Sequence, residues 1–200
     1  MSTPATAITI DPLSLLPGGV GELPVQGRHP AVVPCAQPGG ALQALNGRVP
    51  DLAAIGPNFI EPEAFALCRE LLSLWPGVRL ILYTGHAHDP LVQADAFHTG
   101  IKAVLAREAG EAETLATIAA IQSGGVLFAE AIRKSRPAAL TAREKEVLRL
   151  MAAGKTDKEI AVELMLSVAT VRNHHQRILE KLDVHEKREA VRRGRRLGWV

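Results

Sequence analysis

Residues 140–184 read LTAREKEVLRLMAAGKTDKEIAVELMLSVATVRNHHQRILEKLDV, and the pattern of this stretch decides the fold of the second half of the chain. Its apolar residues recur at helical spacing. Thr141 with Glu144 three residues later makes a capping-box pattern. Gly154 supplies a helix stop, and Ser167 is suited to cap the helix that follows it. The expected helices span residues 141–153, 157–164, 167–182 and 186–197. Together they predict a compact all-α module.

Two of these helices, over residues 158–164 and from Val168 onward, are separated by a short turn and predict a helix-turn-helix. In the second of them, Val171 and Ile178 lie on the apolar face. The side chains expected to point outward are those of Arg172, Asn173, Gln176, Arg177 and Lys181. Such a face offers donors and acceptors to base edges and positive charge to phosphates, and an α-helix fits the major groove. The alternative is a solvated face on a helix that contacts another protein.

The stretch from Leu140 to Val184 also carries the strings LTxRExEVL, GxxxKEIAxxLxLS and TVRxHxxxIxxKL. In these it resembles the DNA-binding domain of LuxR/NarL-type bacterial transcription regulators. The resemblance implies a recognition helix at about Ser167–Lys181. It implies base contacts by Arg172, Asn173 and Gln176. It implies phosphate contacts by Lys158, Thr170, Arg177 and Lys181. The implied partner is double-stranded DNA at a promoter or operator, bound by a homodimer with half-sites about one DNA turn apart.

The last expected helix, over residues 186–197, corresponds to the dimerisation helix of that family. It is unusually basic, because it contains Arg192, Arg193, Arg195 and Arg196. These arginines either form a solvated face or make extra contacts with the DNA backbone. His174 matches a common histidine of the family, whereas His175 replaces a residue that is usually valine.

The first half of the chain alternates short apolar runs with helical stretches, which is typical of a parallel sheet covered on both faces. The expected strands span residues 7–10, 31–35, 52–55, 78–83 and 103–105. The expected helices span residues 40–46, 62–74, 91–98 and 111–122. Residues 12–30 contain four prolines and four glycines, so whether they form a helix stays open. A further helix over Val126–Lys134 is expected within a linker of residues 125–137.

Segment 1–124 resembles the receiver domain of response regulators. The matching strings are Ile8-Thr9-Ile10-Asp11, Pro50-Asp51-Leu52, PGVRLILYT at residues 76–84 and GIKAVLAREA at residues 100–109. The implied fold is a doubly wound (βα)5 parallel sheet. The whole chain is therefore expected to be an α/β receiver-like domain followed by an all-α, four-helix helix-turn-helix domain at residues 138–200.

The phosphorylation pocket that receivers possess is altered in this chain. Gly56 stands where receivers have the phosphoacceptor Asp, at the end of the third strand. Asp11 alone remains of the acidic pair that holds Mg²⁺, Arg107 replaces a lysine, and Thr84 keeps its usual identity. Without an acceptor carboxylate, ordinary phosphorylation is expected to be lost. Either the remnant is structural, with Asp11 paired to Arg107, or the altered pocket binds a small-molecule ligand or a partner protein.

Charge and composition bound the remaining possibilities. The net charge of +2 divides into 9 Lys+Arg against 12 Asp+Glu in residues 1–137 and 14 Lys+Arg against 9 Asp+Glu in residues 138–200. Such asymmetry favours a basic, nucleic-acid-binding module in the second half.

No apolar run approaches a membrane span and no signal peptide is evident, so a bacterial cytoplasmic location is expected. Cys35 and Cys68 do not make a disulfide framework. His86 and His88 lack a third ligand, so no metal site is expected. No GxSxG, Walker A, HExxH or GxGxxG string occurs, which favours neither an enzyme nor a bound cofactor.

The sequence thus predicts a sequence-specific DNA-binding transcription regulator of two-component type. Its receiver-like domain would be regulated independently of Asp phosphorylation, through dimerisation, a ligand or a partner. The alternative is a protein-interaction module that sequesters another regulator and binds DNA weakly.

Overall fold

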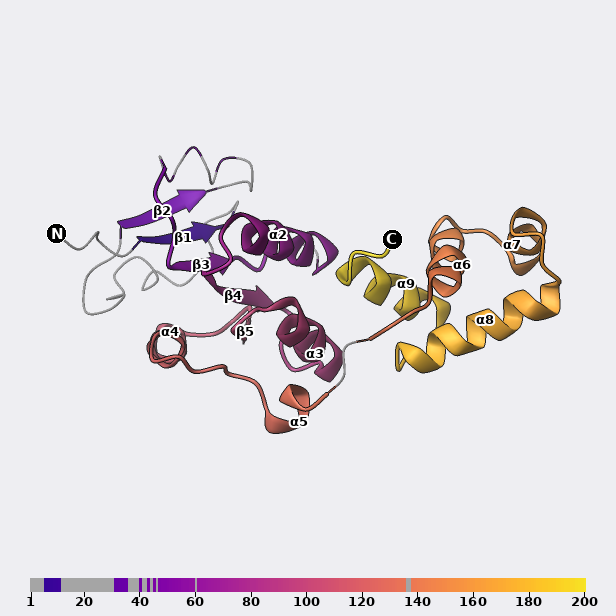
Figure 1. Ribbon diagram of the computed structural model, residues 1–200. Helices are drawn as coiled ribbons and strands as arrows, with labels where there is room; N and C mark the ends of the chain where they lie inside the picture. The colour runs from indigo at the N-terminus through magenta and orange to yellow at the C-terminus, as the bar shows by residue number, and fades with distance from the viewer. Residues whose placement is uncertain are drawn as a thin grey trace. The chain divides into compact units, whose positions relative to one another are not determined.

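The computed structural model describes residues 6–11, 31–35, 40, 43, 45, 47–59, 61–135 and 138–200. Contacts divide the chain into two compact units, Met1–Ser135 and Arg136–Val200 (Figure 1). The first unit is α/β and the second contains only helices in its described part. Within the described ranges, no helix is both long enough and apolar enough to cross a membrane.

The first unit is built on a five-stranded parallel sheet with the strand order β2-β1-β3-β4-β5. The strands are β1 (Thr6–Ile10), β2 (Ala31–Cys35), β3 (Leu52–Ile55), β4 (Arg79–Thr84) and β5 (Ala103–Ala106). Ile8 of β1 is aligned with Val33 of β2 on one side and with Ala53 of β3 on the other. Every residue of β3 is buried, as expected for a strand with both faces covered.

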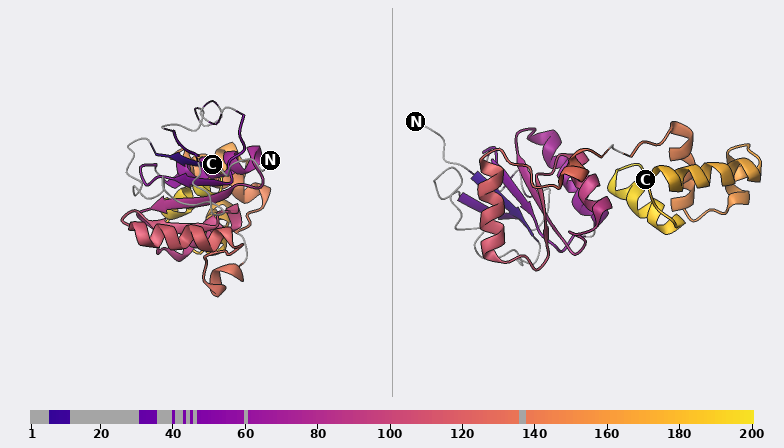
Figure 2. Two further views of the ribbon diagram at one scale, coloured as in Figure 1. Left: turned by 90° about the vertical axis from the view of Figure 1, so that its left-hand side faces the viewer. Right: turned by 90° about the horizontal axis from the view of Figure 1, so that it is seen from below.

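Helices cover both faces of this sheet (Figure 2). They are α2 (Glu61–Leu74), α3 (Pro90–Thr99), α4 (Glu111–Gln122) and the single turn α5 (Glu130–Arg133). On one face, Ile55 belongs to a core that includes Phe65 of α2 and Val92 of α3. On the other face, the neighbouring Ala54 belongs to a core that includes Ile118 of α4. The alternation of strand side chains therefore divides the apolar residues into two cores.

The sequence predicted the regular elements of this unit closely, with one error. All five strands lie within one residue of their expected bounds. The helix expected over Val126–Lys134 is wrong, because only Glu130–Arg133 is helical. The Leu127 backbone N–H donates to the Lys102 carbonyl instead, so this segment is extended against the sheet edge before it turns. Phe128 then packs edge-on against Phe97 of α3.

Three expectations fall wholly or partly outside the described residues. Of the helix expected over residues 40–46, only Gly40, Gln43 and Leu45 are described, and these are helical. Residues 12–30 and the side chain of Cys35 are not described. Cys68 lies in the core with no exposed surface, and burial raises the pKa of its thiol to about 12. It behaves as a small buried apolar residue.

The described residues of the second unit form four helices, each starting where a capping side chain was available. The helices are α6 (Ala142–Ala152), α7 (Asp157–Glu163), α8 (Val168–Lys181) and α9 (Lys187–Arg196). Capping boxes begin α6 at Thr141, α7 at Thr156 and α9 at Glu186. Ser167 caps α8 by accepting from the Thr170 backbone N–H. The helices pack on buried apolar residues that include Val147, Leu148, Met151, Ile160, Val171 and Ile178.

Candidate nucleic-acid interface

The turn between α7 and α8 gives this pair of helices its geometry. The Leu166 backbone N–H reaches back to the Ala161 carbonyl at the end of α7. Between them Met165 adopts a left-handed backbone with φ 53°, and its side chain is 92% exposed. Ser167 then starts α8 as its N-cap. The chain thus reverses over three residues, as a helix-turn-helix requires.

The second helix of the pair, α8, is fixed by one face and exposes the other. Val171 and Ile178 are completely buried against the neighbouring helices. The exposed residues of α8 include all five that were expected to point outward, Arg172, Asn173, Gln176, Arg177 and Lys181. Gln176 Nε2 donates to Glu180 Oε1 at 3.1 Å. Neutral donors and acceptors therefore lie beside guanidinium groups on a surface anchored from behind.

Lys181 differs from the other four because its ammonium already has a partner. Lys181 Nζ lies 2.9 and 2.8 Å from the two carboxylate oxygens of Glu144, whose residue is 3% exposed. The same carboxylate accepts from the Thr141 backbone N–H in the capping box of α6. Burial opposes ionisation of Glu144, but the hydrogen bonds from Lys181 and Thr141 hold the pKa of its carboxyl below its usual value. Lys181 therefore joins the end of α8 to the start of α6, a role its expected phosphate contact did not include.

A second carboxylate, that of Asp157 at the start of α7, lies against the exposed part of α8. Asp157 Oδ2 lies 3.6 Å from Arg172 Nε, and its Oδ1 lies 3.8 Å from His175 Nδ1. The two other expected phosphate contacts have ordinary surroundings. Lys158 is exposed beside Asp157. Thr170 is half-buried, with its hydroxyl 2.8 Å from Ser167 Oγ.

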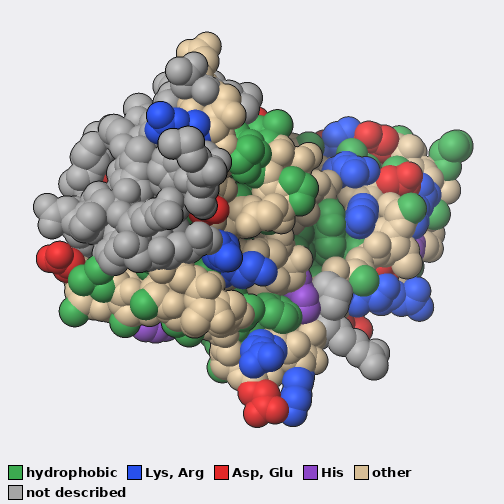
Figure 3. Space-filling view, turned by 60° about the vertical axis from the view of Figure 1, so that its left-hand side comes forward, with side chains coloured by type: hydrophobic (Ala, Val, Ile, Leu, Met, Phe, Trp, Pro, Cys, Tyr) green, Lys and Arg blue, Asp and Glu red, His purple; other side chains and the backbone are tan. Residues whose placement is uncertain are grey.

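Helix α9 divides its arginines between the interior and the surface. Arg193 and Arg196 are 6% and 1% exposed, and Arg193 Nη1 donates to the Leu182 carbonyl at the end of α8. The expectation that all four arginines contribute to a basic surface is therefore wrong for these two. The exposed arginines of α9 are Arg188, Arg192 and Arg195, which recur at i, i+4 and i+7 and so share one face. On the helical unit, to the right in Figure 3, Lys and Arg side chains are interspersed with Asp and Glu.

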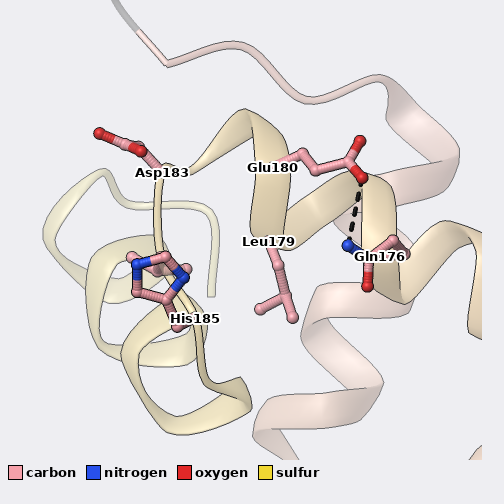
Figure 4. Close-up of a pocket in the computed structure, with 6 residues that line it drawn as sticks. Gln176, Leu179, Glu180, Asp183 and His185 are labelled. Carbon is pink, nitrogen blue, oxygen red and sulfur yellow. Dashed lines mark hydrogen bonds between the residues drawn. The ribbon is translucent and has the colours of Figure 1, made fainter.

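An open hollow of about 410 Å³ lies where α8 ends and the chain turns towards α9. It is lined by Gln176, Leu179, Glu180, Asp183, Val184 and His185. Asp183 points away from Glu180, so the two carboxylates do not converge (Figure 4). No group of three metal-ligating side chains occurs in the described part of the chain.

The expected remnant of a phosphorylation pocket lies where β1, β3, β4 and β5 end. Gly56 directly follows β3, and its backbone N–H donates to the Ile10 carbonyl. Asp11 covers this glycine so closely that a Cβ on Gly56 would lie 2.6 Å from both Asp11 Cβ and Cγ. The Asp11 carboxylate accepts from Asn58 Nδ2 at 2.8 Å and is almost fully buried. Thr84 at the end of β4 accepts from the His86 backbone N–H at 3.2 Å.

The structure gives Arg107 a partner that the sequence did not suggest. Arg107 Nη2 donates to the Pro57 carbonyl at 3.2 Å. The Arg107 side chain therefore reaches the loop after β3, whereas one of the two interpretations of the remnant had paired it with Asp11. Asn58 was missed because an amide in a loop carries no periodic signal. Asp157 was also missed, since only the packing of α7 on α8 brings it to Arg172.

Comparisons with known proteins agree with these two units. Residues 138–193 match the luxR family of bacterial regulatory proteins. The transcriptional regulatory protein DesR of Bacillus subtilis is 37% identical over 162 residues, covering 80% of each chain. The transcriptional activator DevR/DosR of Mycobacterium tuberculosis is 27% identical over 188 residues, covering 86% of each chain. RcsB of Salmonella enterica serovar Typhimurium, solved bound to a promoter, shares the fold with a TM-score of 0.71 at 18% identity, covering 98% of this chain and 100% of that one.

Proposed function

Because the chain belongs to the LuxR/NarL family of response regulators, which are DNA-binding transcription regulators, we propose that it recognises specific promoter sequences through α8. The observation that carries this proposal is the exposed face of α8. Arg172, Asn173 and Gln176 present base-reading groups there, while Val171 and Ile178 anchor the helix from behind. A rigid helix with this surface is suited to the major groove, where base edges are distinguishable. The protein would act where the DNA lies, in the bacterial cytoplasm.

The polar residues of the helix pair divide into two roles. Arg172, Asn173 and Gln176 would contact base edges and so carry sequence preference. Lys158, Thr170 and Arg177 would contact phosphates and so carry affinity for any sequence. Lys181 would contribute chiefly by holding α8 against Glu144, since its ammonium is already bound.

Selection from random duplexes followed by binding measurements tests this division. Arg172→Ala should weaken binding to the selected site by about 1–3 kcal/mol and relax the preference at one base position. Arg177→Ala, the matched control five residues along the same helix, should weaken binding to all duplexes and flatten the salt dependence. An unchanged site preference for Arg172→Ala would contradict the role of α8. Failure of the wild type to select any sequence, together with stable co-purification of another regulator, would favour the sequestering module instead.

We infer further that the α/β unit is a receiver that does not use Asp phosphorylation. Gly56 stands at the acceptor position, and Asp11 fills the space that an acceptor side chain would need. One carboxylate is poor support for an octahedral Mg²⁺, which receivers use to phosphorylate the acceptor. Incubation of the full chain with acetyl phosphate and Mg²⁺, followed by intact-mass measurement, should show no added phosphoryl group. Stoichiometric phosphorylation would overturn this part of the proposal.

The protein would therefore be switched by something other than phosphate, with homodimerisation through the α/β unit as the simplest route. The exposed face of α9 supports this assignment, because Arg188, Arg192 and Arg195 would repel their counterparts across a close two-fold axis. The same three guanidinium groups are suited to the DNA backbone. Removal of the three by alanine substitution should lower affinity for all duplexes and leave the dimer intact in sedimentation measurements. A small-molecule ligand or a partner protein at the altered pocket remains the second route of regulation.

A further inference from the structure

An acid on the other helix of the pair lies beside the proposed base-reading arginine. Asp157, the first residue of α7, has one carboxylate oxygen 3.6 Å from Arg172 Nε. Its other oxygen lies 3.8 Å from His175 Nδ1. Arg172 and His175 are three residues apart on α8, so the carboxylate spans one turn of the helix. The contact therefore lies where the Arg172 side chain leaves the surface of α8 and favours one direction for it.

The atoms in this contact matter because an arginine recognises a guanine with two parallel donors. The ion pair to Asp157 uses Nε, and Nη1 and Nη2 are left for a base edge. Arg172 is 72% exposed at its side chain, whereas the Asp157 side chain is 31% exposed and the His175 side chain 23% exposed. The Asp157 carboxylate thus lies beside Nε of the guanidinium, while Nη1 and Nη2 face solvent on the side where DNA would bind.

His175 keeps the carboxylate in place from the other side. Its Nε2 is buried and makes no hydrogen bond, so the polar contact of the ring on this surface is that of Nδ1 with Asp157. Asp157 also carries a negative charge on a surface proposed to approach phosphates, where it opposes binding to any DNA. An acid at this position lowers affinity for all sequences alike and also restrains one reading residue. Only the restraint on Arg172 changes the difference between a correct and an incorrect site.

We propose that Asp157 is a positioning residue for sequence recognition, which orients Arg172 and so determines the selectivity of the protein at one base position. The proposal rests on the proposed function, because it requires Arg172 to read a base. Under this proposal the sequence preference depends on a residue of α7 as well as on the exposed face of α8.

Selection of full-length protein on random duplexes, with four variants beside the wild type, tests the proposal. Asp157→Asn should bind random duplexes roughly threefold more tightly. It should also lose about tenfold of its preference at the base position that Arg172→Ala identifies. Glu163→Gln, the matched control, removes the same charge from the end of α7, where Glu163 pairs with Lys155. It should raise general affinity similarly and leave the selected sequence unchanged. Asp157→Glu keeps the charge but displaces it by one methylene, and should restore low general affinity with only part of the selectivity.

The outcomes separate the two proposals. If the wild type selects a sequence and Asp157→Asn selects the same one with equal stringency, Asp157 does not position Arg172. The same conclusion follows if Glu163→Gln relaxes the same base position to the same degree. If the wild type selects no sequence at all, the proposed function fails and this inference fails with it. Thermal unfolding of each variant, followed by circular dichroism, separates a loss of selectivity from a loss of folded protein, and Asp157→Glu supplies the measurement should Asp157→Asn unfold.

Discussion

The two units of this protein differ in where the information for their structure lies. In the helical unit, α6, α7, α8 and α9 each begin at a side chain only a few residues from the backbone groups it caps. In the α/β unit, α3 has a side-chain cap from Asp89, whereas α4 and α5 have none. The sheet instead depends on partners distant in the chain, such as Ala7 opposite Leu52. The difference explains why the helical unit can be recognised from short strings, whereas the partners that hold the sheet together are not visible in any one of its strings.

The units also differ in how they use the residues at their functional surfaces. In the helical unit, charged residues of the helix-turn-helix also join helices, as Lys181 does with Glu144. In the α/β unit, packing has taken over the candidate pocket, because Asp11 occupies the space above Gly56. Candidate DNA-binding residues therefore also hold the helical unit together, whereas in the α/β unit packing fills the candidate pocket.

The largest effect is expected from Glu144→Ala, which tests the contact of Glu144 with Lys181 in the helical unit. It removes half of a capping box and the partner of Lys181, so we expect a loss of about 2–4 kcal/mol in the free energy of unfolding. Denaturant unfolding followed by Trp199 fluorescence in a Trp75→Phe background reports this unit. Glu146→Ala is the control, because its exposed pair with Arg143 should contribute less than about 1 kcal/mol. Equal losses in the free energy of unfolding for Glu144→Ala and Glu146→Ala would show that the Glu144–Lys181 contact does not hold the helical unit together.

Acid provides a second readout of the same carboxylate. Its pKa is lowered in the folded state, so its contribution to stability is present above the ordinary value of 4.5 and is lost as the pH falls further through the folded value. The wild-type helical unit should therefore lose more stability than Glu144→Gln on acidification below that value. Parallel acid titrations of the two proteins would contradict the assignment.

A smaller effect, about 1–3 kcal/mol, is expected from Gly56→Asp in the α/β unit. The new side chain would collide with Asp11, so restoring an acceptor should destabilise the unit rather than reactivate it. Gly77→Asp is the control, since a Cβ there meets nothing within 4 Å and its φ is not positive. Thermal unfolding checks both, and Asp11→Ala in the Gly56→Asp protein should recover part of the loss. A Gly56→Asp protein as stable as the control would show that the pocket is not filled.

The smallest effect is expected at the turn of the helix-turn-helix. Met165 has φ 53°, a conformation that asparagine adopts more readily, and its exposed side chain loses little packing on replacement. Met165→Asn should therefore stabilise the helical unit by about 0.5–1 kcal/mol in the same denaturant assay. Val162→Asn replaces another exposed apolar residue within α7 and should give no gain. A loss of stability in Met165→Asn would show that this turn is not strained.

The sequence predicted the features that depend on neighbouring residues. Apolar periodicity located α6 to α9 and the five strands, and the cap at Thr141 marked its helix correctly. The same reasoning placed Arg172, Asn173 and Gln176 on the exposed side of α8, because a helix face follows from spacing alone.

The predictions failed where a distant residue supplied the partner. Arg196 was expected on a basic surface, but the packing of α9 buries it. Leu127 left its expected helix for the Lys102 carbonyl, and Arg107 donates to the Pro57 carbonyl, a partner that the sequence did not suggest. None of these contacts leaves a periodic or local signal in the chain, since each depends on the tertiary arrangement of its unit.

The closeness of Asp11 to Gly56 also has an evolutionary consequence. A single-base change can return aspartate to position 56, but the side chain at position 11 would oppose it at once. In the receiver that we propose, an acceptor at position 56 would require Asp11 to move or to change, and a change would remove a buried carboxylate with its bond to Asn58. A return to aspartate phosphorylation would therefore need coordinated changes at two positions, whereas a new ligand at this pocket would not need the acceptor at all.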